Sequence, residues 1–195
     1  MSRKKSAKRE VIEWLLFIGV ITFLYLTGLH TPVLGALQGL ILKTGIIQPS
    51  TSESTNEIAS YDFKLTDADG NAVDFKQFKN KTVFLNYWAT WCPPCIAEMS
   101  DIDDLFAEFS DNDDIAFVLI SFDKSFSTAK EYVNRKEYAV PIYRLASDLP
   151  SILESQSLPT TFVISPHGEI LVKKQGMAKY NTKKFRNFLE DLSNN

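Results

Sequence analysis

Hydrophobic residues are unevenly distributed along this chain, and the first block of them is continuous. No charged residue occurs between Trp14 and Leu29. With Val11 and Ile12 before it, the run approaches the roughly 20 apolar residues that a helix needs to cross a bilayer. A basic head precedes it, and the positive-inside rule keeps such a head in the cytoplasm. We therefore predict a cytoplasmic head over residues 1–10 and a transmembrane anchor over residues 11–30. A cleaved signal peptide is the main alternative, because it has the same basic-then-apolar order.

A shorter apolar pattern follows within residues 31–60. Four apolar residues of Val33–Ile47 fall at helical spacing: Val33, Leu37, Leu40 and Ile41. The uncharged part, Val33–Leu42, is too short to cross the membrane again. We interpret it as a helix on the outer membrane surface, and packing against the following domain is about as good an interpretation. Polar residues from Gln48 to Ser60 then form a linker without a hydrophobic pattern, which suits a flexible tether.

From residue 61 to residue 195 the pattern alternates between strand and helix periodicity. Asp67-Ala68-Asp69-Gly70 is a turn signal between two short strands and predicts a hairpin. The predicted strands are Phe63–Thr66, Ala72–Phe75, Thr82–Tyr87, Ile115–Ser121, Pro141–Leu145, Thr160–Ile164 and Glu169–Lys173. The predicted helices follow Cys95, cover Thr128–Tyr138 and Leu149–Ser155, and end the chain after an Asn181 cap. This order predicts an α/β domain with a mixed central sheet and helices on both sides.

Composition and charge narrow the class of protein. Hydrophobic residues make up 45% of the 195 residues, which suffices for a core, and the net charge is −3. Five basic residues lie in the first ten; without them and Glu10, the totals of 21 basic and 24 acidic residues fall to 16 and 23. An acidic body has no electrostatic reason to bind nucleic acid.

The only two cysteines stand in Trp91-Cys92-Pro93-Pro94-Cys95, between an apolar strand pattern and an amphipathic helix pattern. Cys92 would lie at the helix start, where the helix dipole stabilises a thiolate, so we expect it to be the attacking thiol. Cys95, one turn on and more buried, would resolve the mixed disulfide. The two thiols could instead form a structural disulfide, but such a short loop stabilises a fold little. A zinc site needs four ligands, and the chain adds only His30 and His167, so we predict no metal.

A longer stretch around the cysteines carries a family resemblance. Asn86-Tyr-Trp-Ala-Thr-Trp-Cys-Pro-Pro-Cys-Ile-Ala-Glu-Met, with the later Leu158-Pro159-Thr160, resembles the membrane-anchored TlpA/ResA-like thiol-disulfide oxidoreductases of bacteria. The resemblance covers about residues 60–195 and implies a thioredoxin fold. It also implies that Pro159 is a cis-proline beside the disulfide and that the Leu158 backbone pairs with a substrate peptide. Ser100 stands where many relatives have a proline.

Two further residues are assigned roles beside the cysteines. Glu98 lies one helical turn after Cys95, where it could take the Cys95 proton. The resemblance supports that role, because the related proteins carry a glutamate there, while Asn86 replaces the strand aspartate of classical thioredoxins. A solvated surface acid is the alternative for Glu98. Trp91, adjacent to Cys92, is the candidate for substrate contact.

These observations favour an enzyme that needs no cofactor and exchanges electrons with disulfide-bearing client proteins. The resemblance implies a periplasmic or extracytoplasmic reductant on the bacterial cytoplasmic membrane. A membrane electron donor would re-reduce it, and cytochrome c maturation is a typical destination. An oxidant or isomerase of the same fold is an alternative. A Cu(I)-binding, metallochaperone-like module is another, because a dithiol suits a soft ion. A peroxidase is disfavoured, because its nucleophilic cysteine needs a different sequence setting.

Overall fold

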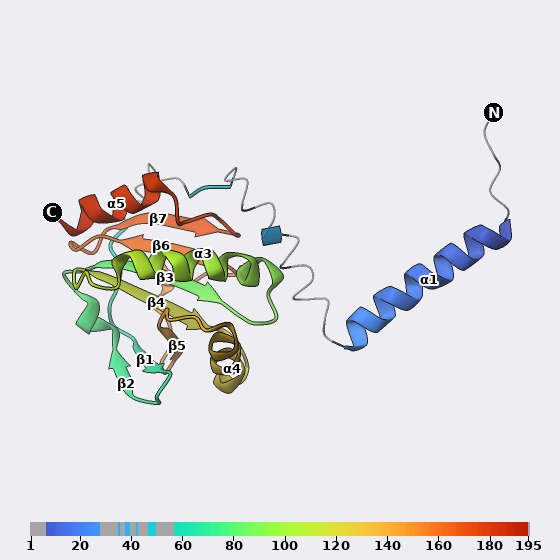
Figure 1. Cartoon of the computed structure of the whole chain (residues 1–195). Helices are drawn as coiled ribbons and strands as arrows, with labels where there is room; N and C mark the ends of the chain where they lie inside the picture. The colour runs from blue at the N-terminus through green and yellow to red at the C-terminus, as the bar shows by residue number, and fades with distance from the viewer. Residues whose placement is uncertain are drawn as a thin grey trace.

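The computed structural model describes residues 7–27, 35, 38–39, 42, 47–49 and 57–194. The predicted head therefore lies mostly outside the described residues, as does much of the predicted surface helix and of the polar linker. The described part begins with helix α1 (Ala7–Leu26), which stands apart from a sheet domain in Figure 1. The domain itself starts slightly before residue 61. Its first bonds run from Ala59 N to the Gly168 carbonyl oxygen (2.8 Å) and from Ile170 N to the Glu57 carbonyl oxygen (2.9 Å).

The domain is built on one mixed sheet of seven strands. Along the chain these are β1 (Lys64–Asp67), β2 (Ala72–Asp74), β3 (Thr82–Trp88), β4 (Ile115–Ser121), β5 (Ile142–Leu145), β6 (Thr160–Ile164) and β7 (Ile170–Gln175). Across the sheet their order is β2-β1-β5-β4-β3-β6-β7. The strands β3, β4 and β5 run parallel, whereas β1 pairs antiparallel with β5, and β6 with β3. The carboxyl ends of β3 and β4 thus meet at one edge of the sheet, which we call the redox edge.

The three long helices of the domain are α3 (Pro93–Phe109), α4 (Phe126–Lys136) and α5 (Lys183–Ser193). All three pack on the same face of the sheet, in one cluster that includes Met99, Ala129 and Phe185 (Figure 1). The prediction of helices on both sides therefore holds only in part, because the helices on the other face are short 3₁₀ helices. The chain moves from β3 to β4 to β5 in one direction, so two right-handed crossovers place α3 and α4 on one face.

The opposite face of the sheet is covered by shorter pieces. These are residues 59–63 and the 3₁₀ helices η1 (Phe75–Phe78) and η2 (Ser151–Leu153). Alternate residues of the parallel strands serve the two faces. Phe84 and Trp88 point to the long helices, while Leu85 and Tyr87 point to this second core. The centre of the sheet is thus buried on both sides, which explains why every residue of β3 is buried and most of them are apolar.

The predicted strands match the observed ones to within one or two residues. The predicted cap of the last helix is wrong by one position. Thr182, not Asn181, is the N-cap of α5, and its Oγ1 accepts a hydrogen bond from Phe185 N at 3.3 Å. The Asn181 side chain instead accepts a hydrogen bond from Arg186, and its backbone N–H donates to Asp101 Oδ2 at 2.9 Å. Asn181 therefore links the start of α5 to α3.

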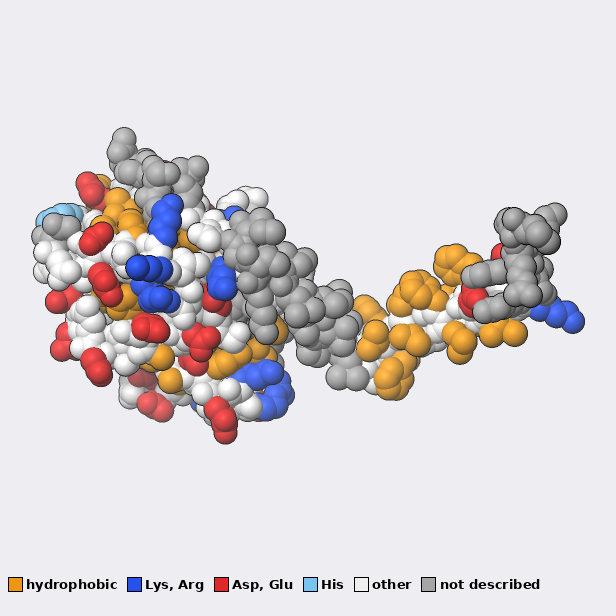
Figure 2. Space-filling model, turned by 45° about the horizontal axis from the view of Figure 1, so that its top comes forward, with side chains coloured by type: hydrophobic (Ala, Val, Ile, Leu, Met, Phe, Trp, Pro, Cys, Tyr) orange, Lys and Arg blue, Asp and Glu red, His pale blue; other side chains and the backbone are white. Residues whose placement is uncertain are grey.

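Helix α1 exposes apolar side chains around its whole circumference. The large ones from Val11 to Leu26 are between 50% and 80% exposed, except Leu24, which is half-buried. Figure 2 shows them projecting along α1, whereas the visible face of the domain mixes acidic, basic and neutral side chains. Within the described residues, no helix meets the length and hydropathy required to span a bilayer.

Candidate active site

The two cysteines lie at the redox edge, in the first turn of α3. Strand β3 ends at Trp88, and the chain reaches the helix through Ala89, Thr90 and Trp91. Cys92 and Cys95 are joined by a disulfide, with their Cα atoms 5.3 Å apart. Cys92 is the N-cap residue of α3, in an extended conformation that ends the loop and starts the helix. The sequence thus placed this pair correctly relative to the strand and the helix.

Exposure distinguishes the two cysteines. Cys92 is 5% exposed and Cys95 is fully buried, so Cys92 is the more accessible residue of the pair. Trp91, next to it, is 58% exposed, whereas Trp88 is buried in the core against Tyr132. Of the two tryptophans near the pair, Trp91 is therefore the one that a client could contact.

The start of α3 is poor in backbone donors. Pro93 and Pro94 occupy its first two positions and have no N–H groups. The next N–H, that of Cys95, donates to Cys92 Sγ at 3.3 Å. In the reduced protein this N–H and the helix dipole would both stabilise a Cys92 thiolate. The first turn of α3 contains no acidic residue that would oppose it.

Glu98 lies on the same helix as the two cysteines, α3, and is fully buried. Its Oε1 accepts a hydrogen bond from Asn86 Nδ2 at 3.0 Å, and its Oε2 accepts one from Ala178 N at 3.1 Å. Desolvation by burial raises the pKa of Glu98 to about 8, although both hydrogen bonds act in the opposite direction. In the disulfide form Glu98 therefore holds a proton at neutral pH. The burial excludes a solvated surface acid, and the shuttle role stays a prediction.

Asn86 connects Glu98 to the centre of the sheet. Its Nδ2 also donates to Thr161 Oγ1 at 2.9 Å, and Tyr180 Oη donates to the same hydroxyl at 2.7 Å. Asn86 Oδ1 is buried and has no hydrogen-bond partner among the described residues. A second arrangement also satisfies these groups. In it the side-chain amide of Asn86 is rotated, so that its Oδ1 accepts a hydrogen bond from the protonated carboxyl group of Glu98.

Pro159 lies at the same edge, before β6. Thr160 pairs with Tyr87, so the sheet register carries Pro159 to the end of β3, where the cysteine loop begins. The Leu158–Pro159 peptide bond is cis, as the resemblance implied. Leu158 is half-buried and packs against the apolar clusters on both faces. Pairing of the Leu158 backbone with a substrate peptide stays a prediction.

The sequence did not single out Asp123, which holds the loop before Cys92. Its Oδ1 accepts a hydrogen bond from Thr90 Oγ1 at 2.6 Å, and its Oδ2 accepts from Thr90 N at 3.1 Å and from Ser121 Oγ at 2.9 Å. The loop is also tied down by a bond from Phe122 N to the Trp88 carbonyl oxygen at 2.8 Å. Asp123 was not predicted, because Thr90, the loop residue that it holds, lies 33 residues away.

Phe122 is the second feature that the sequence did not indicate. Its side chain is 36% exposed, and its ring lies 5.4 Å from that of Tyr87. Together with Trp91, it places an exposed aromatic side chain at each of the two strand ends that form the redox edge.

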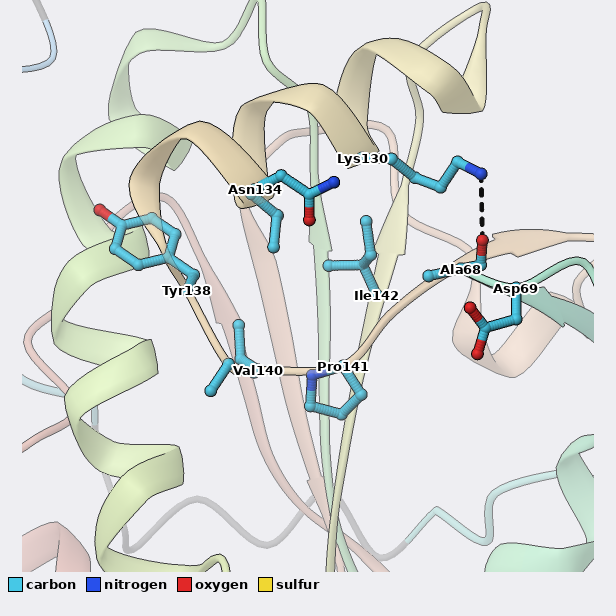
Figure 3. A pocket seen from close by; sticks show the side chains of 10 residues that line it. Ala68, Asp69, Lys130, Asn134, Tyr138, Val140, Pro141 and Ile142 are labelled. Atoms are coloured by element: carbon cyan, nitrogen blue, oxygen red, sulfur yellow. Dashed lines mark hydrogen bonds between the residues drawn. The ribbon is translucent and has the colours of Figure 1, made fainter.

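A separate cavity of about 400 Å³ lies between α4, the β1–β2 turn and the start of β5 (Figure 3). Lys130 crosses it and donates to the Ala68 carbonyl oxygen at 3.1 Å. The residues that line it include neither cysteine nor Glu98, so the redox chemistry takes place elsewhere. Over the described part of the chain, no group of three or more His, Cys, Asp or Glu side chains is arranged to hold a metal ion.

A redox-active cysteine pair at a helix start, on a mixed sheet with a cis-proline beside it, defines the thioredoxin-like thiol-disulfide oxidoreductases. Within that class, this chain belongs to the AhpC/TSA family, whose sequence profile matches residues 58–173.

Individual relatives and solved structures agree with this class. The chain is 28% identical over 132 residues to the thiol-disulfide oxidoreductase ResA of Halalkalibacterium halodurans, covering 66% of this chain and 73% of the relative. It is 29% identical over 140 residues to that of Oceanobacillus iheyensis, covering 69% and 71%. Among structures, a thiol:disulfide interchange protein from Bacteroides sp. superposes with a TM-score of 0.59 at 19% identity, covering 75% of this chain and 93% of that one. A thioredoxin family protein from Chlorobium tepidum gives 0.55 at 21% identity, covering 70% and 97%. At such identities the two structures support the fold alone.

Proposed function

We propose that this protein reduces disulfides in client proteins outside the cytoplasmic membrane. The observation that carries the proposal is the asymmetric redox pair. Cys92 is the more accessible cysteine, and Cys95 is fully buried on the same helix as Glu98, whose pKa is raised to about 8. Such an arrangement suits an attack by one thiol and a resolution by the other.

The exchange proceeds in two steps. In the reduced protein the Cys92 thiolate attacks a client disulfide, forms a mixed disulfide and expels one client thiolate, which takes up a proton. Glu98, in its carboxylate form, then accepts the Cys95 proton. The Cys95 thiolate attacks Cys92 Sγ, which frees the second client thiol and leaves the Cys92–Cys95 disulfide. Two electrons pass to the client, and a membrane electron donor returns two electrons to restart the cycle.

The finer parts of this proposal rest on different supports. Attachment to the bacterial cytoplasmic membrane is supported by the uncharged run Trp14–Leu29 and by the exposed apolar side chains of α1. The extracytoplasmic orientation is supported by the basic head and the positive-inside rule. The reductant role and a place in cytochrome c maturation are supported by the family resemblance.

The midpoint potential of the Cys92–Cys95 couple tests the direction of electron flow. Equilibration of the full chain against glutathione or dithiothreitol buffers should give a value near that of thioredoxin, about −270 mV. A value near −120 mV would identify an oxidant instead. Alkaline extraction and vesicle flotation of the full chain test its attachment to membranes.

Single cysteine variants test the roles of the two sulfurs. We expect the reduced Cys95→Ser variant to accumulate a mixed disulfide with insulin. Cys92 still attacks an insulin disulfide, but no second thiol resolves the product. Cys92→Ser should accumulate none, because Cys95 is buried. Equal trapping by both variants would contradict the assignment. Tight binding of Cu(I) together with negligible thiol–disulfide exchange would show that the protein is a metal-binding module rather than an enzyme.

A further inference from the structure

The chain between α1 and the domain contacts the redox helix itself. The described residues Gly35, Gln38, Gly39 and Leu42 are helical, and Leu42 is only 3% exposed. A Cβ atom built on Gly35 would lie 3.1 Å from Ile96 Cγ2 and 3.3 Å from the Pro93 carbonyl oxygen. A Cβ atom on Gly39 would lie 3.9 Å from the Ala97 carbonyl oxygen. Gly35, Gly39 and Leu42 have the spacing of one helical face, and that face lies against the first turns of α3.

The contact continues beyond Leu42. Ile47 packs against the apolar cluster under the long helices, and its carbonyl oxygen accepts a hydrogen bond from Lys179 N at 2.8 Å. Pro49 is buried as well. We call the described residues 35, 38–39, 42 and 47–49 the docking segment. Its Gly35 and Gly39 lie against Pro93, Ile96 and Ala97 of α3.

The point at which the chain finally joins the sheet makes this contact important. Residues 57–59 bond to the turn at residues 168–170, and that turn follows the end of β6. Ile164, the last residue of β6, pairs with Val83 near the start of β3. This junction is therefore at the edge opposite the redox edge, about 20 Å away along a seven-residue strand. If the chain contacted the domain only at this junction, the end of the domain attached to α1 would be the one opposite the cysteines.

With the docking segment in contact, the end of the domain nearest to α1 along the chain is the redox edge. Gly35 touches Pro93, the residue after Cys92, so the chain meets the redox edge first. Eight residues separate Leu26, the end of α1, from Gly35. Eight residues span at most about 30 Å when fully extended. The sulfur pair is thus confined to within about 30 Å of the end of α1, plus the few ångströms between Gly35 and Cys92.

We infer that the docking segment holds the redox edge at the membrane surface, so that Cys92 exchanges preferentially with thiols and disulfides carried there by a membrane-bound partner. The inference rests on the proposed thiol exchange and membrane attachment. Its physical basis is effective concentration: a short connection keeps the sulfur near partners in the same membrane, and a released domain would dilute it.

The experiment uses the full, reduced chain in lipid vesicles with two pyridyl disulfide probes. One probe is attached to a phosphatidylethanolamine headgroup, and the other is soluble 2,2′-dithiodipyridine. With either probe the Cys92 thiolate attacks the probe disulfide and expels pyridine-2-thione, whose absorbance gives the rate. Cys95 then closes the protein disulfide and releases the other half of the probe, which is a lipid thiol from the first probe and a second pyridine-2-thione from the second. The soluble-probe absorbance is therefore divided by two. The measured quantity is the ratio of the lipid-probe rate to the soluble-probe rate.

Matched glycine variants isolate the docking contact. Gly35→Ala must displace either Ile96 or the segment, whereas Gly39→Ala makes an ordinary contact, and both substitutions raise helix propensity equally. We expect Gly39→Ala to keep the wild-type ratio, Gly35→Ala to lower it, and Gly35→Leu to lower it by about fivefold or more. Circular dichroism and the melting temperature verify that each variant is folded.

The possible outcomes distinguish failure of this inference from failure of the proposed thiol exchange or membrane attachment. A wild-type ratio in Gly35→Leu would overturn the inference, and so would an equal loss with both probes, since that indicates damage to the redox pair. Wild-type protein that fails to float with vesicles would instead refute the proposed attachment. Wild-type protein inert toward the soluble probe would refute the proposed exchange.

Discussion

At the scale of single residues, two carboxyl groups support the redox pair in different ways. Glu98 is fully buried, with a pKa raised to about 8 by desolvation, so it can change its charge during turnover. Asp123 is half-buried at the surface and accepts hydrogen bonds from Thr90 and Ser121. The first group is suited to moving a proton, and the second to holding the loop that carries Trp91 and Cys92.

Glu98→Gln tests the proton transfer. As a base, Glu98 must be ionised, so we expect resolution of the mixed disulfide in the wild type to accelerate as the pH rises through about 8. The variant should lose this inflection and slow the step by roughly 100-fold, a typical contribution of general acid–base catalysis. Stopped-flow measurement of the second client thiol between pH 6 and pH 9.5 gives the profile. Asp104→Asn, an exposed acid on the same helix, is the control; an inflection that survives in Glu98→Gln would assign it to another group.

Asp123→Ala tests the loop contact. The substitution leaves the Thr90 N–H and hydroxyl without their acceptor, and hydrogen bonds to a charged group contribute about 2 kcal/mol. We expect a lower free energy of unfolding and a changed Cys92 alkylation rate at a fixed pH. Asp123→Asn keeps one acceptor oxygen and should restore part of both. Asp113→Ala, an exposed acid before β4, should change neither. An unaltered alkylation rate in Asp123→Ala would leave Asp123 with a purely structural role.

At the scale of elements, local patterns and long-range contacts were predictable to different degrees. Strand β3 and helix α3 could be read from the sequence, because burial of β3 on both faces leaves a nearly continuous apolar run and the apolar face of α3 leaves a helical period. The cysteine pair could be read for the same reason, since Cys92 lies where those two signals meet. The face chosen by α4 depends on the direction of two crossovers, and that direction is visible only once the strand order is known.

The end of α5 shows how a tertiary contact overrides a local one. Asn181 and Thr182 are both good N-cap residues, so the sequence alone does not separate them. Asp101 on α3 accepts bonds from the N–H groups of Tyr180 and Asn181, and this contact sets where the helix begins. Asp123 escaped prediction on the same ground, because Thr90 lies 33 residues away. The packing of the docking segment was one of two interpretations that the sequence left open, and only the structure separates them.

Paired substitutions at the start of α5 test this explanation. Thr182→Ala removes the acceptor for Phe185 N and should lower the free energy of unfolding by about 1 kcal/mol. Asn181→Ala removes only the side-chain contact with Arg186, so its effect should be smaller. Urea unfolding of the two variants gives the comparison. A larger loss in Asn181→Ala would show that the side chain of Asn181, rather than that of Thr182, stabilises the helix start.

At the scale of the whole molecule, the buried Glu98 links stability to pH. Its pKa is about 8 in the folded disulfide form and close to the ordinary 4.5 in the unfolded chain. Between these two values the folded protein holds a proton that the unfolded chain has lost. Stability should therefore fall as the pH rises through this window, by at most about 1.4 kcal/mol per pH unit from this one group.

Comparison with Glu98→Gln isolates this contribution, because the neutral amide does not titrate. We expect the urea midpoint of the oxidised wild type to decrease from pH 5 to pH 8 relative to that of the variant, and the difference to level off above pH 8. Asp101, whose pKa burial also raises, remains in both proteins and cancels in the comparison. Glu108→Gln, an exposed position on α3, should give a curve parallel to the wild type. Parallel curves for Glu98→Gln and the wild type would mean that Glu98 is ionised in the folded protein at neutral pH. It could not then hold the proton that Cys95 releases when the disulfide closes, and the shuttle role would fail with it.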